Sequence, residues 1–325
     1  MSPDARLFTS GRLLLSIALC VRAVSSVCAD ERPTIREEFD KARRIVFLGD
    51  SITAAGQYVA YVDAWLTART RGKAPQLLLN AGLPSETVSG LSEEGHAGGK
   101  FPRPDLAERL DRVLKVTKPD LVIACYGMNC GIYEPFDEGR FAKYQEGMKS
   151  LKAKVEAAGA RFIVMTPPFY DDLRAPKKFA YNEVLDRYAE WLIARRADGW
   201  QVIDLHVPMT AEIKKRRETD PKFTFQPDGV HPNDAGHWAV AQQVLKALGD
   251  EKAAAAASPK EMLMNVDAPA ELLPLVQQRV NTLRDAHVAT AGHKRPGVAP
   301  GLPLPDALKK ADELSARIAD LWKNK

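Results

Sequence analysis

The chain has 325 residues, of which 45% are hydrophobic and 27% are charged, and its formal net charge is +4. This composition is typical of a globular protein with a sizeable core. The small net charge gives no electrostatic reason to expect a nucleic acid or an anionic membrane surface as a partner.

The first 29 residues have the pattern of a secretory signal. Arg6 and Arg12 precede the apolar run LLLSIALCV, and the small-residue sequence Val27-Cys28-Ala29 follows it. The apolar run is too short for a stable membrane-spanning helix. We therefore expect cleavage after Ala29 and export to the periplasm or the cell exterior. The alternative is a leader without a targeting role.

Short apolar runs alternate with amphipathic stretches after this leader. The apolar runs predict strands at 44–49, 76–82, 121–127, 161–168 and 201–205. The stretches between and after them predict helices at 57–71, 103–117, 138–158, 177–198 and 234–248. Continuous apolarity is typical of strands buried on both faces of a parallel sheet. The alternation indicates a doubly wound α/β fold, in which ligands bind at the carboxyl ends of the strands.

The regular alternation ends after Gly249. The segment EKAAAAASPK, residues 251–260, predicts a linker or a frayed helix, and two helical patterns follow around a Pro- and Gly-rich loop at 291–305. The sequence therefore predicts a main domain at 30–250 and a helical extension at 251–325 that can pack back on the core.

Ser51 follows the first predicted strand in the sequence Gly49-Asp50-Ser51. Taken alone, a serine at this point is a helix N-cap. The second strand, however, ends in Asn80-Ala81-Gly82 and the third in Gly127-Met128-Asn129. These segments bring backbone N–H groups and amide side chains to the same edge of the sheet, where they can stabilise an oxyanion. Ser51 is therefore also a candidate nucleophile.

A serine nucleophile needs a base, because a free hydroxyl reacts slowly near neutral pH. Of the six histidines, His231 lies in the motif-like context QPDGVHPNDAGHWAVAQ, and Asp228 precedes it by three residues on a Pro- and Gly-rich turn. One loop thus presents an imidazole and a carboxylate that can fix its tautomer. The same spacing fits a helix N-terminus or half of a metal site, but no second cluster has ligand spacing. We expect neither a metal nor another cofactor.

Several other polar residues have structural interpretations. We expect Asp50 to accept hydrogen bonds from nearby backbone N–H groups rather than act as a second acid. We expect His206, His237 and Trp238 to pack in the core or in loops. His96 belongs to a glycine-rich loop, 93–104, that we expect at a rim of the site. For the basic segment HKRPG, 293–297, we favour a solvated loop over a site that binds phosphate or carboxylate.

Cleavage after Ala29 leaves two cysteines, Cys125 and Cys130. A disulfide between them requires a tight loop that brings their Cα atoms within about 7 Å. We favour two free, buried thiols over a disulfide.

Four segments resemble, in order, the four sequence blocks of the SGNH hydrolases, also called GDSL-type esterases and lipases. They are Gly49-Asp50-Ser51, the glycine of NAGLPSETVSGL, the Gly-x-Asn of YGMNCG and the loop DGVHP. The resemblance spans about residues 43–248. It implies a flavodoxin-like three-layer α/β/α sandwich with a central parallel five-stranded sheet.

The resemblance also implies roles for individual residues. Ser51 is the nucleophile, His231 is the base, and Asp228 orients His231. The oxyanion donors are the Ser51 backbone N–H, Gly82 and the Asn129 side chain.

Two blocks depart from the usual pattern. Cys130 stands where the third block often has aspartate, and Pro84-Ser85-Glu86-Thr87 stands where the second block often reads Ser-Gly-Asp-Thr. We expect these changes to alter local packing and substrate preference, while catalysis survives.

The resemblance and the leader together predict an exported serine esterase that hydrolyses short-chain acyl esters, with O-acetyl groups on carbohydrate as the preferred class. An O-acyltransferase with the same triad and a catalytically inactive carbohydrate-binding protein are the alternatives. A lipase of longer chains is less attractive, because the loops near the motifs lack a wide apolar surface. The sequence leaves the oligomeric state open.

Overall fold

Five parallel strands form the central sheet in the order β2-β1-β3-β4-β5. The computed structural model describes residues 33–323, so the predicted signal lies outside the described residues. The strands are β1 (Arg44–Gly49), β2 (Leu77–Asn80), β3 (Leu121–Cys125), β4 (Arg161–Met165) and β5 (Gln201–Ile203). This strand order is the flavodoxin-like one, whose switch point lies between β1 and β3. The predicted fold class and its five strands are confirmed.

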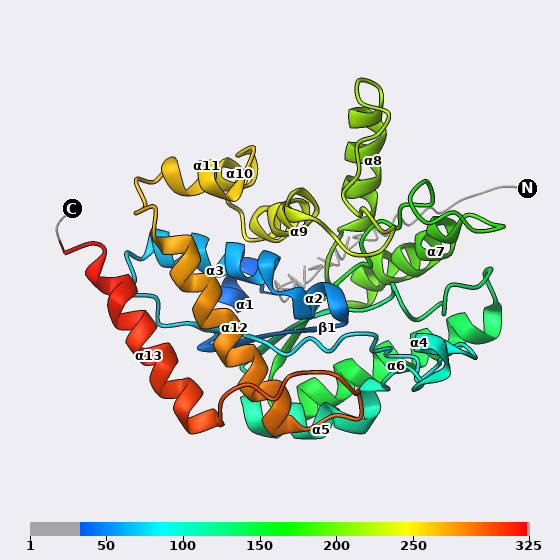
Figure 1. Ribbon diagram of the computed structural model, residues 1–325, viewed down its shortest axis with the longest axis horizontal. Coiled ribbons are helices and arrows are strands. Elements are labelled where there is room, and N and C mark those ends of the chain that lie inside the picture. The colour runs from blue at the N-terminus through cyan, green and yellow to red at the C-terminus, as the bar shows by residue number, and fades with distance from the viewer. Residues whose placement is uncertain (1–32, 324–325) are drawn as a thin grey trace, which may run out of the picture. The chain divides into compact units, whose positions relative to one another are not determined.

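Alternate residues of β1 point to two separate hydrophobic cores. Ile45 and Phe47 lie in the first core and Val46 and Leu48 in the second, and all four are buried. The helices that cover the first face include α1 (Ile35–Lys41), α3 (Gln57–Arg69) and α9 (Asp234–Ala247). The helices that cover the second face are α5 (Leu106–Thr117), α6 (Glu138–Ala157) and α7 (Tyr181–Ala194). In Figure 1, α3 and α9 lie above β1, while α5 and α6 lie below it.

The five helices predicted by periodicity are present, with slightly shorter bounds. The sequence missed α1, α2 (Ser51–Ala55), α4 (His96–Gly99), α8 (His206–Arg217) and the short 3₁₀ helix at Arg195–Asp198. The first of these begins at a capping box between Thr34 and Glu37. Helix α8 buries Met209 and Ile213 but leaves Val207 exposed, so it shows only a weak apolar stripe.

The segment predicted as a linker or frayed helix is instead packed and ordered into α10 (Glu251–Ala254) and α11 (Pro259–Met264). Asp250 and Ser258 cap the two helices with their side chains. Ala256, between the helices, is buried, and its carbonyl accepts a hydrogen bond of 3.0 Å from the Trp238 indole N–H. The small alanine side chains therefore allow close packing against α9. The sequence of this segment, which has no apolar periodicity, did not predict that packing.

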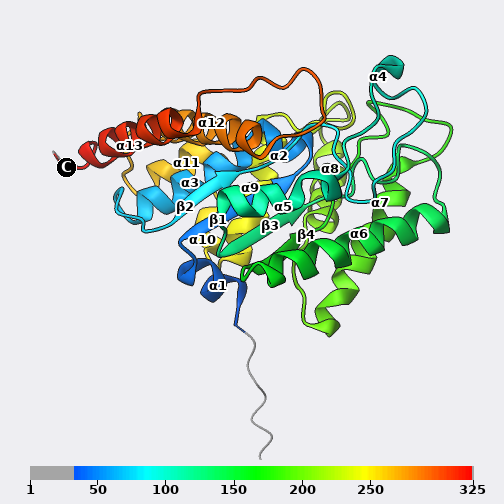
Figure 2. The same cartoon turned by 90° about the horizontal axis from the view of Figure 1, so that it is seen from below.

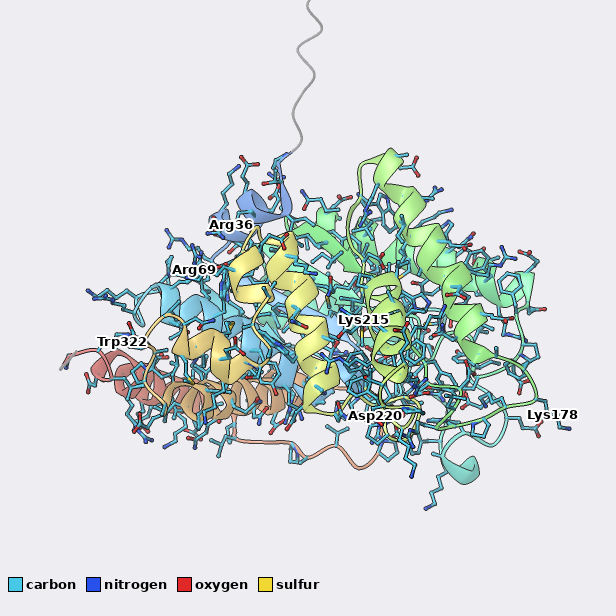
Figure 3. All side chains as sticks on the ribbon, turned by 90° about the horizontal axis from the view of Figure 1, so that it is seen from above. Arg36, Arg69, Lys178, Lys215, Asp220 and Trp322 are labelled. Carbon is cyan, nitrogen blue, oxygen red and sulfur yellow. The ribbon has the colours of Figure 1, made fainter. Side chains whose placement is uncertain are left out.

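Cation–π contacts and hydrogen bonds around Trp65 connect the start of this segment to α1 and α3. The guanidinium groups of Arg36 and Arg69 lie 5.7 and 5.2 Å from the ring of Trp65. Both arginines are labelled in Figure 3, near one another at the end of the structure where the described chain begins. The Trp65 indole N–H and Arg69 also donate to the Asp250 carboxylate, at 2.9 and 2.7 Å. Helices α1, α3 and α10 are thereby joined through one indole ring.

The last two helices, α12 (Leu272–Ala291) and α13 (Leu304–Asp320), cover the β2 edge of the sheet. Figure 2 shows them beside α3 and β2. Helix α12 buries Val276 and Val280 in the first core and Leu283 in the second. Arg279 donates to both carboxylate oxygens of Asp63 on α3, at 2.9 Å each. The C-terminal extension is therefore part of both cores and protects an edge strand.

Within residues 33–323, no helix has both the length and the apolarity that crossing a membrane requires.

The packing of α12 predicts that Leu283→Ala lowers the free energy of unfolding by about 2–4 kcal/mol, because it leaves a cavity in a closed core. Urea denaturation of the purified protein measures the change. Thr290→Ala is the matched control, since Thr290 is exposed on the same helix, and it should change the free energy by less than about 0.5 kcal/mol. If the extension were only loosely attached, Leu283→Ala would change the free energy of unfolding as little as Thr290→Ala does.

Candidate active site

The carboxyl end of β1 and the loop before α9 bring three polar side chains together. Ser51 is the first residue of α2, directly after β1, and Asp228 and His231 lie on the loop between α8 and α9. The Ser51 hydroxyl lies 2.9 Å from His231 Nε2. His231 Nδ1 lies 2.7 Å from Asp228 Oδ2. The structure therefore joins Ser51, His231 and Asp228 in one hydrogen-bonded chain.

The cap of helix α2 is Asp50, not Ser51. Asp50 Oδ1 accepts a hydrogen bond of 2.9 Å from the Ile52 backbone N–H, so the N-cap interpretation of Ser51 is wrong. The turn before it needs glycine, because a Cβ at Gly49 would fall 2.2 Å from Thr53 Oγ1 and 2.7 Å from the Cys125 carbonyl oxygen. Burial raises the Asp50 pKa to about 6, although the Ile52 hydrogen bond opposes the shift. The structural role predicted for Asp50 agrees with this geometry and leaves the serine hydroxyl available to His231.

The Asp228 carboxylate fixes both the loop and the imidazole. Its Oδ1 accepts backbone hydrogen bonds from Val230, at 2.9 Å, and from His231, at 2.7 Å. Partial burial raises the Asp228 pKa, but hydrogen bonds from the His231 side chain and backbone outweigh it, so the pKa lies below its ordinary value. Asp228 is thus a carboxylate near neutral pH. It binds the protonated Nδ1 of His231 and leaves Nε2 as the acceptor that faces Ser51.

Asn129, at the carboxyl end of β3, is held by two neighbours. Its Nδ2 donates to the Glu86 carbonyl at 3.2 Å, and its Oδ1 accepts from the Tyr133 hydroxyl at 2.9 Å. An amide nitrogen carries two hydrogens, so one remains for a ligand. Glu86 is itself buried and receives two hydrogen bonds from Arg109, at 2.6 and 2.7 Å. This buried ion pair fixes the loop that orients Asn129.

Gly82 lies just after β2, beside α2. Its N–H donates to Asn80 Oδ1 at 2.9 Å, and its role as an oxyanion donor stays a prediction. A Cβ at Gly82 would fall 2.4 Å from the Ala54 backbone nitrogen, so glycine is needed for the close approach to α2. Ser85, at the position of the usual glycine, has a φ of 68°. The loop therefore keeps a left-handed backbone conformation that favours glycine, despite the serine.

The other singled-out aromatic and imidazole side chains are packed. Buried His206 lies 2.7 Å from Asp186 through its Nε2. His237 stacks on Tyr58, and burial lowers its pKa to about 4, so it is neutral near pH 7. Trp238 is buried. The packing predictions are confirmed for these three residues, while His96, which lies 3.1 Å from Glu93, stays a predicted rim residue.

Cys125 and Cys130 are free and buried, as expected. Burial raises the pKa of both thiols, that of Cys130 to about 12, so neither forms a thiolate near neutral pH. In the described part of the chain, no group of three or more His, Cys, Asp or Glu side chains is placed to hold a metal ion.

A pocket of about 450 Å³ opens beside Ser51. The first part of the chain lines it with small residues and one proline: Ala54, Ala55, Gly82 and Pro84. The C-terminal extension supplies the rest of the lining: Arg284, Asp285, Val288, Arg295, Gly297, Val298 and Ala299. Arg295 and Gly297, from the segment predicted as a solvated loop, line this pocket, and Gly297 is exposed. A short basic cluster carries no periodic signal that would have placed it here.

A serine, a histidine and a carboxylate linked in this way at the switch point of a parallel sheet define a serine hydrolase site. Residues 47–239 match the GDSL-like Lipase/Acylhydrolase family. This match covers more than half of the chain, which therefore belongs to that family and is a carboxylic ester hydrolase.

Individual relatives match about two thirds of the chain. The chain is 24% identical over 233 residues to an acetylxylan esterase of Geobacillus stearothermophilus, a match that covers 64% of this chain and 94% of the relative. A gut microbial diltiazem-metabolizing enzyme is similar in structure, with 26% identity and a TM-score of 0.51; the match covers 64% of this chain but only 47% of that enzyme. An alpha/beta hydrolase from the metagenome of Lake Arreo, Spain, has 24% identity and a TM-score of 0.50, with coverage of 64% and 95%. Helices α12 and α13 lie outside the residues that match the family.

The raised pKa of Asp50 predicts how stability depends on pH. An acid whose folded pKa lies above its unfolded value binds more protons when folded, so its contribution to stability falls as pH rises. Asp50→Asn cannot ionise and keeps an oxygen that can cap α2. We expect the stability of the wild type relative to this variant to fall by about 2 kcal/mol between pH 4 and pH 7, from the shift of 3.8 to about 6. Denaturant unfolding at both pH values tests this, and a constant difference would contradict it.

The bond from Asp228 to His231 predicts that Asp228→Asn lowers kcat on an acetyl ester by about two to four orders of magnitude, because the imidazole loses its fixed tautomer. Asp234→Asn is the control, since Asp234 is an exposed acid three residues after His231. Steady-state hydrolysis of p-nitrophenyl acetate compares the two variants. If the two variants had equal activity, Asp228 would have no role in the reaction.

Proposed function

We propose that this protein is an exported serine esterase that removes short acyl groups, above all O-acetyl groups, from carbohydrate. The observation that carries the proposal is the continuous chain from the Ser51 hydroxyl through His231 to Asp228, at 2.9 and 2.7 Å.

The reaction follows from the positions of these groups. His231 Nε2 accepts the hydroxyl proton while Ser51 Oγ forms a bond to the ester carbonyl carbon. The backbone N–H of Ser51, which begins a helix, and the free amide hydrogen of Asn129 stabilise the resulting oxyanion. His231 then gives its proton to the leaving sugar oxygen. His231 then takes a proton from a water molecule, whose oxygen bonds to the acyl carbon. The bond from that carbon to Ser51 Oγ breaks, Oγ regains the proton from His231, and acetate is released.

Hydrolysis is favoured over acyl transfer because the base is open to water. The side chains of His231 and Asp228 are 53% and 57% exposed, so solvent reaches the acyl-enzyme without a lid movement. A catalytically inactive binding protein is disfavoured by the complete hydrogen-bonded chain.

Three observations support the finer parts of the proposal. The pocket wall next to Ser51 is made of small residues, which suits a short acyl group. The acetylxylan esterase relative supports an acetyl ester of a carbohydrate. The Arg6–Ala29 leader pattern supports export.

The test is acetate release by the mature protein from acetylated polysaccharides, with Ser51→Ala as the control. We expect Ser51→Ala to lose at least about a thousandfold in kcat, because the attacking oxygen is absent. A fluorophosphonate probe should label the wild type on Ser51 and leave the variant unlabelled. Activity retained by Ser51→Ala refutes the nucleophile, and faster hydrolysis of octanoate than of acetate esters refutes the short-chain preference.

A further inference from the structure

The pocket beside Ser51 has one wall that lies outside the family match. Helix α12 and the loop at 292–303 supply Arg284, Asp285 and Arg295 to it. The chemistry of this wall is therefore a property of this chain and bears on which ester reaches Ser51.

The wall is held at both ends of its loop. Arg112 on α5 donates from Nε to the Ala291 carbonyl at 2.6 Å and from Nη2 to the Gly292 carbonyl at 3.3 Å. At the other end, Gly301 has a φ of 68°, and a Cβ there would lie 2.7 Å from the Cβ of Asp285. The intervening segment is thus fixed against α5 and α12.

Arg284 has its charge and most of its donors satisfied. Its Nε donates to Asp285 at 2.8 Å, and its Nη1 donates to the Ala54 carbonyl at 2.7 Å and to Asn281 at 3.1 Å. The hydrogen bond to Ala54 holds the C-terminal end of the helix that begins with Ser51. Arg284 is therefore an anchor, and its neighbour Asp285 offsets its charge.

Arg295 differs in both respects. Among residues 33–323, no carboxylate forms an ion pair with it, and its buried Nε has no hydrogen-bond partner. Its Nη1 donates only to the carbonyl of Pro296, at 2.6 Å, and its guanidinium carbon lies 5.4 Å from the ring centroid of Phe101. A guanidinium that rests on an aromatic ring with unused N–H donors is suited to bind a carboxylate in a bidentate manner.

The other charged groups near the serine do not compensate Arg295. Arg103 is buried and donates to both carboxylate oxygens of Glu93, at 2.6 Å each. Asp228 is bound to His231. Asp50 is buried beneath α2 and bound to the Ile52 N–H. The charged side chains that line the pocket therefore leave one net positive charge, on Arg295.

We propose that Arg295 binds a carboxylate of the substrate, so that the preferred esters are O-acetyl groups on an acidic sugar of the uronic acid class. This inference rests on the proposed esterase function of Ser51 and adds a specificity-determining residue to it. Arg295 takes no part in the chemical steps.

The test uses two substrates that differ only in this charge: an O-acetylated methyl glucoside and the corresponding methyl glucuronoside. We expect the wild type to have the lower KM for the glucuronoside. Arg295→Gln should raise the ratio of the KM for the glucuronoside to the KM for the glucoside about tenfold. Arg295→Lys should retain part of the preference, because it keeps the charge but loses the bidentate geometry. Added salt should weaken the preference, because the site is partly open to solvent.

Lys294→Gln is the matched control. It removes the same charge one residue away, from an exposed side chain that does not line the pocket. The control should leave the ratio of the two KM values unchanged. An equal effect of Lys294→Gln and Arg295→Gln would reduce the preference to general electrostatic attraction and overturn the proposal.

Two further outcomes separate this inference from the esterase function. If Arg295→Gln changes both substrates equally, Arg295 only packs the loop, and the inference fails while the esterase stands. Calorimetric binding of the unacetylated methyl glucuronoside to Ser51→Ala and to Ser51→Ala/Arg295→Gln requires no turnover. Binding that does not depend on Arg295 overturns the inference whether or not the protein hydrolyses esters, and loss of binding with Arg295→Gln supports it.

Discussion

The hydrogen bond from the Ile52 N–H to the buried Asp50 carboxylate is the interaction on which the site depends. It caps α2 and thereby leaves the next side chain, Ser51, free to bond with His231. Helix α2 lies close to the ends of β1 and β2. Gly49 and Gly82 permit this close approach because neither carries a Cβ. The cost is a carboxylate whose ionisation is opposed by burial. Stability is thus reduced at the turn that presents Ser51, the proposed nucleophile, as is common at functional sites.

The C-terminal extension turns a family fold into a larger single structure. Helix α12 contributes to both hydrophobic cores, α10 packs on α9, and α11 packs on α3. We therefore propose that the boundary at residue 250 divides the sequence but not the folded unit. A wall of the pocket is then built from the same helix that closes the edge of the sheet. Helix α12 therefore contributes both to the stability of the fold and to the shape of the pocket.

Much of the fold followed from local patterns. Continuous apolar runs predicted all five strands, because burial on both faces requires them, and the spacing of glycine, serine, asparagine and histidine motifs predicted which strand ends meet. The residues Ser51, His231 and Asp228 lie together as the sequence indicated.

What the sequence could not predict depends on contacts between distant segments. The alanine-rich segment after Asp250 packs only because Trp238 and Gln242 meet its carbonyl groups. Arg295 reaches the pocket because Arg112, 183 positions earlier in the printed sequence, holds the start of its loop. None of these pairs has a spacing signal.

The hydrogen bond from Arg284 to the Ala54 carbonyl has a consequence for the order in which the protein matures. Ser51, Asp228 and His231 all precede α12 in the chain, so during synthesis they emerge before the helix that supports them. Until α12 reaches the sheet, β2 is an open edge that can pair with another chain. Packing of α12 therefore covers this edge and also brings Arg284, Asp285 and Val288 to the pocket.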